Sequence, residues 1–177
     1  MRSVTLNQLE SHVWEAANIL RGPVDAADFK TYVFPLLFFK RLSDVHDEEH
    51  RAALAESGGD EEYALFPQNY RFQIPDAFHW QDVRVVTTNV GQALQKAMRG
   101  IERVNPETLY GIFGDGRCTN KDRLSDSLLR DLIEHFSRID VDNQAAQVDI
   151  LGQSYDKGEA ARPNTCWLSK SDAPFVR

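Results

Sequence analysis

Cysteine is scarce in this chain of 177 residues: Cys118 and Cys166 are its only two. Neither lies in the paired spacing of a structural zinc site, and two cysteines are too few for the disulfide framework of a small secreted domain. This cysteine usage predicts a protein of the reducing cytoplasm.

Long apolar runs are also missing, since the longest extends only from Tyr32 to Phe39. A run of that length is much too short to span a bilayer. Residues 1–5 lead into an amphipathic segment without the uninterrupted apolar centre of a signal peptide. We therefore expect no membrane partner.

A basic excess is absent, because 20 Lys and Arg residues face 27 Asp and Glu residues, for a net charge of −7. Nonspecific binding to duplex DNA requires a basic face, so the balance argues against a simple electrostatic DNA binder. A local basic stripe within an acidic protein stays compatible with this charge.

Catalytic signatures are missing as well. The sequence contains no nucleophile elbow, no Walker loop and no glycine-rich methyl-donor loop. Asn105-Pro106 is followed by Glu107-Thr108 rather than by the proline and aromatic residue that clamp a flipped adenine. We expect no catalytic and no cofactor-binding residue in this chain, and no enzymatic activity from it alone.

Helical periodicity is what the sequence does contain. Residues 29–44 are apolar on nearly every side for two turns, which is typical of a helix buried among other helices, although Pro35 should kink it. Another amphipathic helix precedes it at 6–20. The predicted core consists of Trp14, Leu20, Phe29, Val33, Leu36, Leu37, Leu129 and Phe136.

Three more helices are predicted, from Thr88 or Asn89 to the stop at Asn105-Pro106, over 124–136, and over 143–155. Residues 70–74 alternate apolar and polar side chains, which indicates a short strand. The predicted fold is therefore mainly α: a multi-helix globular bundle with at most a short strand or hairpin near 70–86. Periodicity ends after Lys157, so we expect a domain over 1–156 and a divergent, flexible tail over 157–177.

A basic stripe is the first candidate site. Lys96, Arg99 and Arg103 share one helix face, and further basic residues follow at 117, 121 and 123. Such a stripe could contact DNA phosphates, but more often it only solvates a helix. The DNA-contact candidates are Lys96, Arg99, Arg103, Lys121 and Arg123.

A histidine pair is the second candidate. His46 and His50 are four residues apart, the spacing by which zinc peptidases place two ligands on one helix face. Asp47 stands where those enzymes have a glutamate as general base, and no third histidine follows at a suitable spacing. We predict a charged, solvent-facing helix end without metal, and keep a zinc-dependent hydrolase as the alternative.

Several segments together resemble a known family. Residues 13–22, 29–44, 132–140 and 149–155 are similar, in order and spacing, to the N-terminal helical domain of the modification subunit of type I restriction-modification systems. Pro75 and Trp80 also fall where that family has a proline and a tryptophan. After Tyr155 the family pattern breaks, so no catalytic residue of the family can be carried onto this chain.

The resemblance implies a role without local chemistry. The full subunit of that family transfers a methyl group from S-adenosylmethionine to adenine N6 in DNA. Its helical domain flanks the methyltransferase core, helps to assemble it with the specificity and restriction subunits, and helps to clamp the complex around double-stranded DNA. A helical protein-interaction module unrelated to DNA is a further alternative.

Overall fold

The computed structural model describes residues 6–25, 28–114 and 124–141, and all structural statements below refer to these ranges. They form helices and connecting segments without any strand, so the prediction of a mainly α fold is confirmed. The helices are α1 (Leu6–Leu20), α2 (Phe29–Glu56), α3 (Glu61–Ala64), the short 3-10 helix η2 (Pro67–Asn69), α4 (Trp80–Arg84), α5 (Val90–Val104) and α6 (Asp126–Phe136).

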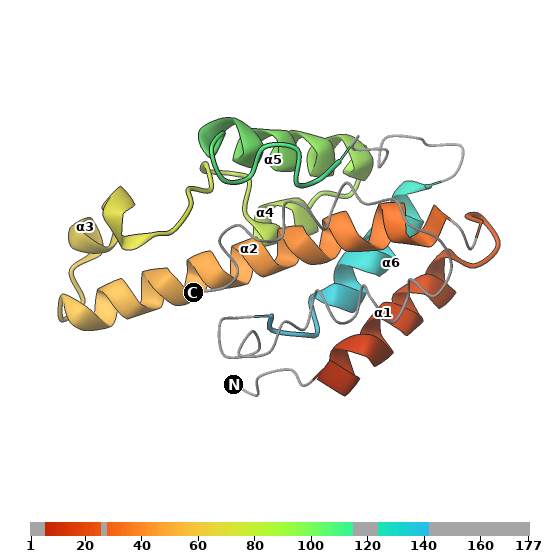
Figure 1. The fold of residues 1–177 in the computed structure, drawn as a ribbon, viewed down its shortest axis with the longest axis horizontal. Coiled ribbons are helices and arrows are strands. Elements are labelled where there is room, and N and C mark those ends of the chain that lie inside the picture. The colour runs from red at the N-terminus through yellow and green to blue at the C-terminus, as the bar shows by residue number, and fades with distance from the viewer. Residues whose placement is uncertain (1–5, 26–27, 115–123, 142–177) are drawn as a thin grey trace.

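Helix α2 is the central element, as the apolar stretch of the sequence predicted. It has 28 residues, continues across the buried Pro35, and runs along the length of the molecule (Figure 1). Helix α1 lies on one side of it and α4 and α5 on the other, while α6 crosses behind α2 and contacts all three. Its position explains why its first half is apolar all round.

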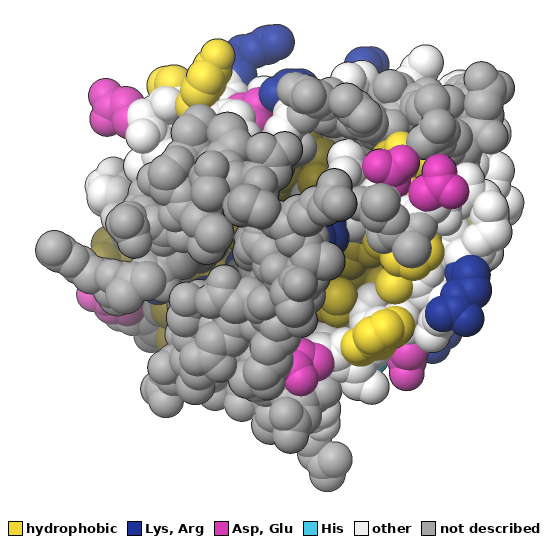
Figure 2. All heavy atoms as spheres, turned by 45° about the vertical axis from the view of Figure 1, so that its right-hand side comes forward, with side chains coloured by type: hydrophobic (Ala, Val, Ile, Leu, Met, Phe, Trp, Pro, Cys, Tyr) yellow, Lys and Arg dark blue, Asp and Glu magenta, His cyan; other side chains and the backbone are white. Residues whose placement is uncertain are grey.

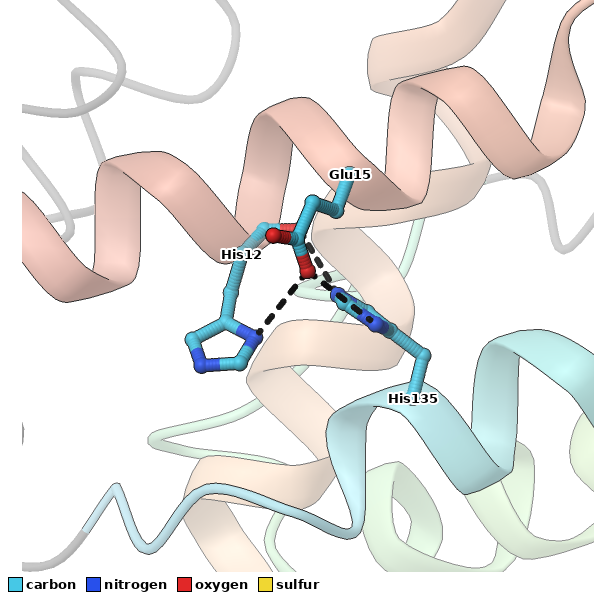
Figure 3. A group of neighbouring side chains, drawn as sticks. All are labelled: His12, Glu15 and His135. Carbon is cyan, nitrogen blue, oxygen red and sulfur yellow. Dashed lines mark hydrogen bonds and ion pairs between the residues drawn. The ribbon is translucent and has the colours of Figure 1, made fainter.

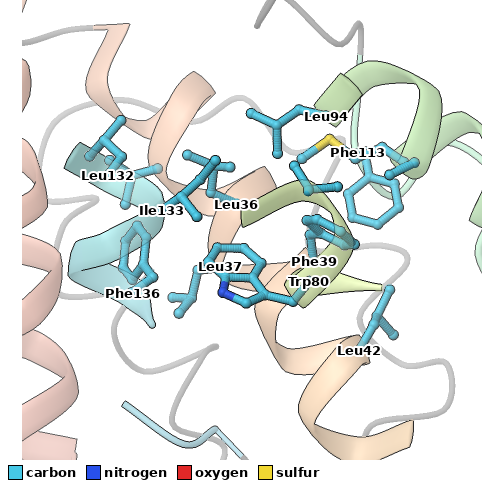
Figure 4. Close-up of a cluster of buried hydrophobic side chains, with 14 of the residues drawn as sticks. Leu36, Leu37, Phe39, Leu42, Trp80, Leu94, Phe113, Leu132, Ile133 and Phe136 are labelled. Atoms are coloured by element: carbon cyan, nitrogen blue, oxygen red, sulfur yellow. The ribbon is translucent and has the colours of Figure 1, made fainter. Parts of the chain in front are cut away.

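The hydrophobic core surrounds the first half of α2 (Figure 4). Most of the predicted core is confirmed, and Phe29 packs against the core while only partly buried. The prediction for Trp14 was wrong, because its side chain is 67% exposed. The buried face of α1 is centred on Leu9, Ala16 and Leu20, and at 100° per residue Trp14 lies on the far side of the helix.

The predicted strand at 70–74 was also wrong. Phe72 and Ile74 are buried as the alternation suggested, but side chains rather than a second strand satisfy the backbone between them. The backbone N–H of Gln73 donates to the side-chain oxygen of Asn105 at 2.8 Å. The side-chain nitrogen of Asn105 donates to the backbone carbonyl of Gln73 at 2.7 Å. An extended segment can thus be anchored on a helix end without forming a sheet.

Helices α5 and α6 begin close to the predicted positions. The carboxylate of Asp126 accepts hydrogen bonds from the amides of Asn89 and Val90 at 2.8 and 2.9 Å, so the first residue of α6 caps α5. The predicted helix at 143–155 and the tail at 157–177 lie outside the described residues. No helix in the described ranges is long and apolar enough to cross a membrane.

Candidate nucleic-acid interface

The basic stripe predicted from the sequence lies on α5. Lys96, Arg99 and Arg103 are all exposed, and the opposite face of the helix buries Leu94 and Ile101 in the core. The other two candidates, Lys121 and Arg123, lie outside the described residues. The structure therefore brings together the α5 part of the stripe and leaves DNA contact by all five residues a prediction.

Arg99 differs from its two neighbours because its charge is already compensated. Its guanidinium forms an ion pair with Glu102 at 2.7 Å and donates to the carbonyl of Gly114 at 2.9 Å. The other oxygen of the same buried carboxylate accepts a hydrogen bond from the amide of Phe113 at 3.2 Å. Arg99 and Glu102 together fasten the segment ending at Gly114 to α5.

Lys96 and Arg103 show no hydrogen bond or ion pair with any other described residue. Seven residues separate them along α5, which corresponds to about 10 Å of helix axis. Uncompensated cations at that separation can each meet a different phosphate. Figure 2 shows both basic and acidic side chains among the coloured residues on one face of the molecule.

A polar segment of α2 lies at the end of its apolar stretch and is buried. Lys40, Arg41 and Ser43 are 4%, 2% and 1% exposed. Lys40 forms an ion pair with Asp44, one turn further along α2. Burial raises the pKa of Asp44, and the neighbouring Lys40 ammonium opposes this shift.

This polar segment holds two distant parts of the chain against α2. Arg41 donates to the carbonyl of Val141 at 2.6 Å, and the Val141 amide donates to Asp44 at 2.8 Å. Ser43 accepts a hydrogen bond from the amide of Trp80 at 2.7 Å, and the Trp80 indole donates to Ser137 at 2.8 Å. Residues 40–44 therefore serve tertiary structure rather than an exposed site.

The histidine pair of α2 is held by other aromatic side chains. His46 stacks on Tyr70 with ring centroids 4.1 Å apart, and His50 Nδ1 lies 2.8 Å from the Tyr70 hydroxyl. Burial, followed by the nearby His79 and His50, lowers the pKa of His46 to about 4. The ligand atoms that converge are those of His46, Asp47 and His79, and His50 is not among them. The arrangement does not favour the zinc-peptidase alternative.

A second convergent cluster escaped the sequence interpretation entirely. Side-chain ligand atoms of His12, Glu15 and His135 all lie within 4.8 Å of one another. The first two residues belong to α1 and the third to α6, so no local motif connects them. Only the packing of these two helices reveals the cluster.

In the described ranges the fold is an all-helical domain, and the family-like segment at 29–44 forms much of its interior. Residues 9–136 match the HsdM N-terminal domain, and the chain belongs to this family. It is also similar to the type I restriction enzyme MpnII methylase subunit of Mycoplasma pneumoniae, with 23% identity over 189 residues. That match covers 88% of this chain and 35% of the relative, so the chain spans about a third of the relative's length. The family predicted from the sequence is confirmed.

Proposed function

We propose that this chain is the helical assembly domain of a type I modification subunit, whose full-length form methylates adenine in DNA from S-adenosylmethionine. The observation that carries the proposal is the family match over residues 9–136, and the methylase relative supports it. The proposed partners are the methyltransferase core, the specificity and restriction subunits, and double-stranded DNA. The domain itself would contribute packing surfaces and phosphate contacts rather than chemistry.

Within that function we assign different roles to the predicted DNA contacts. Lys96 and Arg103 are proposed to contact phosphates, because they are exposed and no described residue compensates their charge. Arg99 is proposed to act as a positioning residue, since Glu102 and the Gly114 carbonyl already use its donors. Lys121 and Arg123 stay in the proposed contact set on sequence grounds.

The test is a salt titration of the assembled complex. Each phosphate contact contributes about 0.9 to the slope of log K against log salt concentration, so a Lys96→Ala, Arg103→Ala double variant should lower the slope by nearly two units. Sequence preference should not change, because phosphate contacts carry no sequence information. An Arg130→Ala, Arg138→Ala variant removes the same charge from exposed positions on and just after α6 and serves as the matched control.

The three possible results differ clearly. A reduced slope for the α5 variant with an unaltered control supports direct phosphate contact. Equal reductions of the slope in both variants would indicate a general effect of net charge. An unchanged slope would mean that Lys96 and Arg103 are solvent-exposed residues that do not contact DNA. Either of the last two results contradicts the proposed contacts while leaving the family assignment intact.

A further inference from the structure

The cluster of His12, Glu15 and His135 lies where α1 packs on α6 (Figure 3). His12 and Glu15 are three residues apart and share one face of α1, while His135 is in the last turn of α6. Their side chains point toward one another across the contact between the helices. The cluster therefore joins two segments that are far apart in the sequence.

The hydrogen bond of His135 fixes its tautomer. Its Nε2 atom lies 2.9 Å from the backbone carbonyl of His12, and because a carbonyl oxygen only accepts, Nε2 must carry the hydrogen. In a neutral ring Nδ1 is then left with a lone pair, and it faces the Glu15 carboxylate at 3.9 Å. His135 is only 5% exposed, so water cannot readily separate these two electron-rich atoms.

His12 adds a second unsatisfied atom to the same place. Its Nδ1 atom is buried and lacks a hydrogen-bond partner among the described residues. It lies 4.0 Å from the same Glu15 oxygen, too far for a hydrogen bond. A buried polar atom without a partner is costly, so a ligand bound at this nitrogen would be stabilising.

A divalent metal ion satisfies all three atoms at once. Two imidazole nitrogens and one carboxylate form a common ligand set for zinc, and water can take the fourth position. The hydrogen bond from the other His135 nitrogen to a backbone carbonyl is the usual way in which a histidine ligand is oriented.

Binding requires a rearrangement of the three side chains. Ligand atoms of a tetrahedral zinc ion are about 3.3 Å apart, so the carboxylate must approach each histidine by roughly 0.6 Å, and the two histidine nitrogens, which lie within 4.8 Å of each other, must also close to that separation. Glu15 can make this movement because its side chain is 60% exposed.

We propose that His12, Glu15 and His135 form a Zn²⁺ site that fastens α1 to α6. This inference goes beyond the proposed function, since it concerns the stability of the domain and requires neither DNA nor other subunits. It also revises the sequence prediction of a chain without metal ligands, at positions that the sequence did not single out. A bound ion would hold the first helix of the fold against its last described helix.

The test uses the untagged full chain, freed of metal by a chelator and titrated with Zn²⁺ in a calorimeter. Wild-type protein should bind one equivalent. His12→Ala and Glu15→Gln should each weaken binding at least tenfold. The hydrogen bond that His135 donates survives His12→Ala because its acceptor is a backbone carbonyl, and Glu15 is exposed, so both variants should keep the metal-free unfolding temperature.

His79→Asn is the matched control, because it removes a histidine from the other convergent cluster of His46, Asp47 and His79. It should leave zinc binding unchanged. In wild-type protein, zinc at about 100 times its dissociation constant should raise the unfolding temperature by about 5–10 °C, and this rise should be lost in Glu15→Gln.

Two results would overturn the proposal. One is the absence of saturable zinc binding by the wild-type chain, which would mean that a proton rather than a metal ion lies between the histidines and Glu15. The other is binding that persists in Glu15→Gln and disappears in His79→Asn. Neither result bears on the family assignment or on the phosphate contacts of α5.

Discussion

Truncating Leu37 tests the central position of α2 most directly. Its side chain is fully buried, with Trp80, Ile133 and Phe136 in the surrounding cluster (Figure 4). Leu37→Ala removes three carbon atoms, worth roughly 2.4 kcal/mol of transfer free energy at about 0.8 kcal/mol each. A cavity term adds to this because packed side chains relax only partly, so the free energy of unfolding should fall by about 2–5 kcal/mol.

Urea denaturation at equilibrium measures this loss. The midpoint should fall while the slope with denaturant stays unchanged, since the surface exposed on unfolding is nearly the same. Leu65→Ala is the matched control, because it makes the same chemical change at a side chain that is 69% exposed. The control should change stability by less than about 0.5 kcal/mol. Equal small losses in both variants would refute the placement of α2 at the centre of the core.

Two further predictions concern buried polar groups. Ser43→Ala should cost about 1–3 kcal/mol because it leaves the buried amide of Trp80 without its 2.7 Å acceptor, whereas Ser11→Ala at an exposed position of α1 should be nearly neutral in the same urea assay. The pKa of His46 falls from 6.5 to about 4 on folding, so its contribution to stability is complete above pH 6.5 and is lost as the pH falls toward 4. When the pH is lowered from roughly 7.5 to 5, the free energy of unfolding of His46→Gln should therefore fall by about 1 kcal/mol less than that of wild type, a figure discounted for the partial solvent exposure of the ring. An identical pH dependence of stability in the two proteins would refute this.

The helices were predictable because their signals are local. An apolar residue every three or four positions and a polar residue at each end identified α5 and α6 to within about two residues. The same local signal misplaced Trp14, because the apolar residues of α1 spread over a wide arc and the sequence does not reveal which part of that arc meets the neighbouring helices.

Residues 70–74 illustrate a second limit of local pattern. Their alternation correctly indicated which side chains are buried, but it could not reveal that the amide of Gln73 pairs with Asn105 of the α5 C-terminus rather than with a strand. Alternating apolar and polar residues indicate only that the backbone is extended and that one side of the segment is buried. Both conditions are met here without a sheet. Burial was predictable from sequence at this segment, whereas the hydrogen-bond partner was not.

The convergent cluster on α1 and α6 lies beyond any sequence interpretation of this kind. His12 and His135 come from opposite ends of the described chain, and each on its own is an ordinary helical histidine. The pair at His46 and His50 attracted attention because it resembles a known local motif, yet the structure directs those two rings toward Tyr70. Tertiary packing, which a single sequence does not encode locally, determines which histidines meet.

The number of basic side chains available for binding DNA is where sequence and structure differ most for function. A cation binds a phosphate less readily when an internal group already compensates its charge, and three basic residues of the described structure, of which Arg99 was a DNA-contact candidate, are used within the fold. Lys40 pairs with Asp44, Arg41 holds the Val141 carbonyl, and Arg99 pairs with Glu102. Counting basic residues along the sequence therefore overestimates the surface that can meet DNA. On α5 the described structure leaves Lys96 and Arg103 for the proposed phosphate contacts. Neutralising all three basic residues of this helix face should therefore lower the slope of log K against log salt concentration by nearly two units rather than by three.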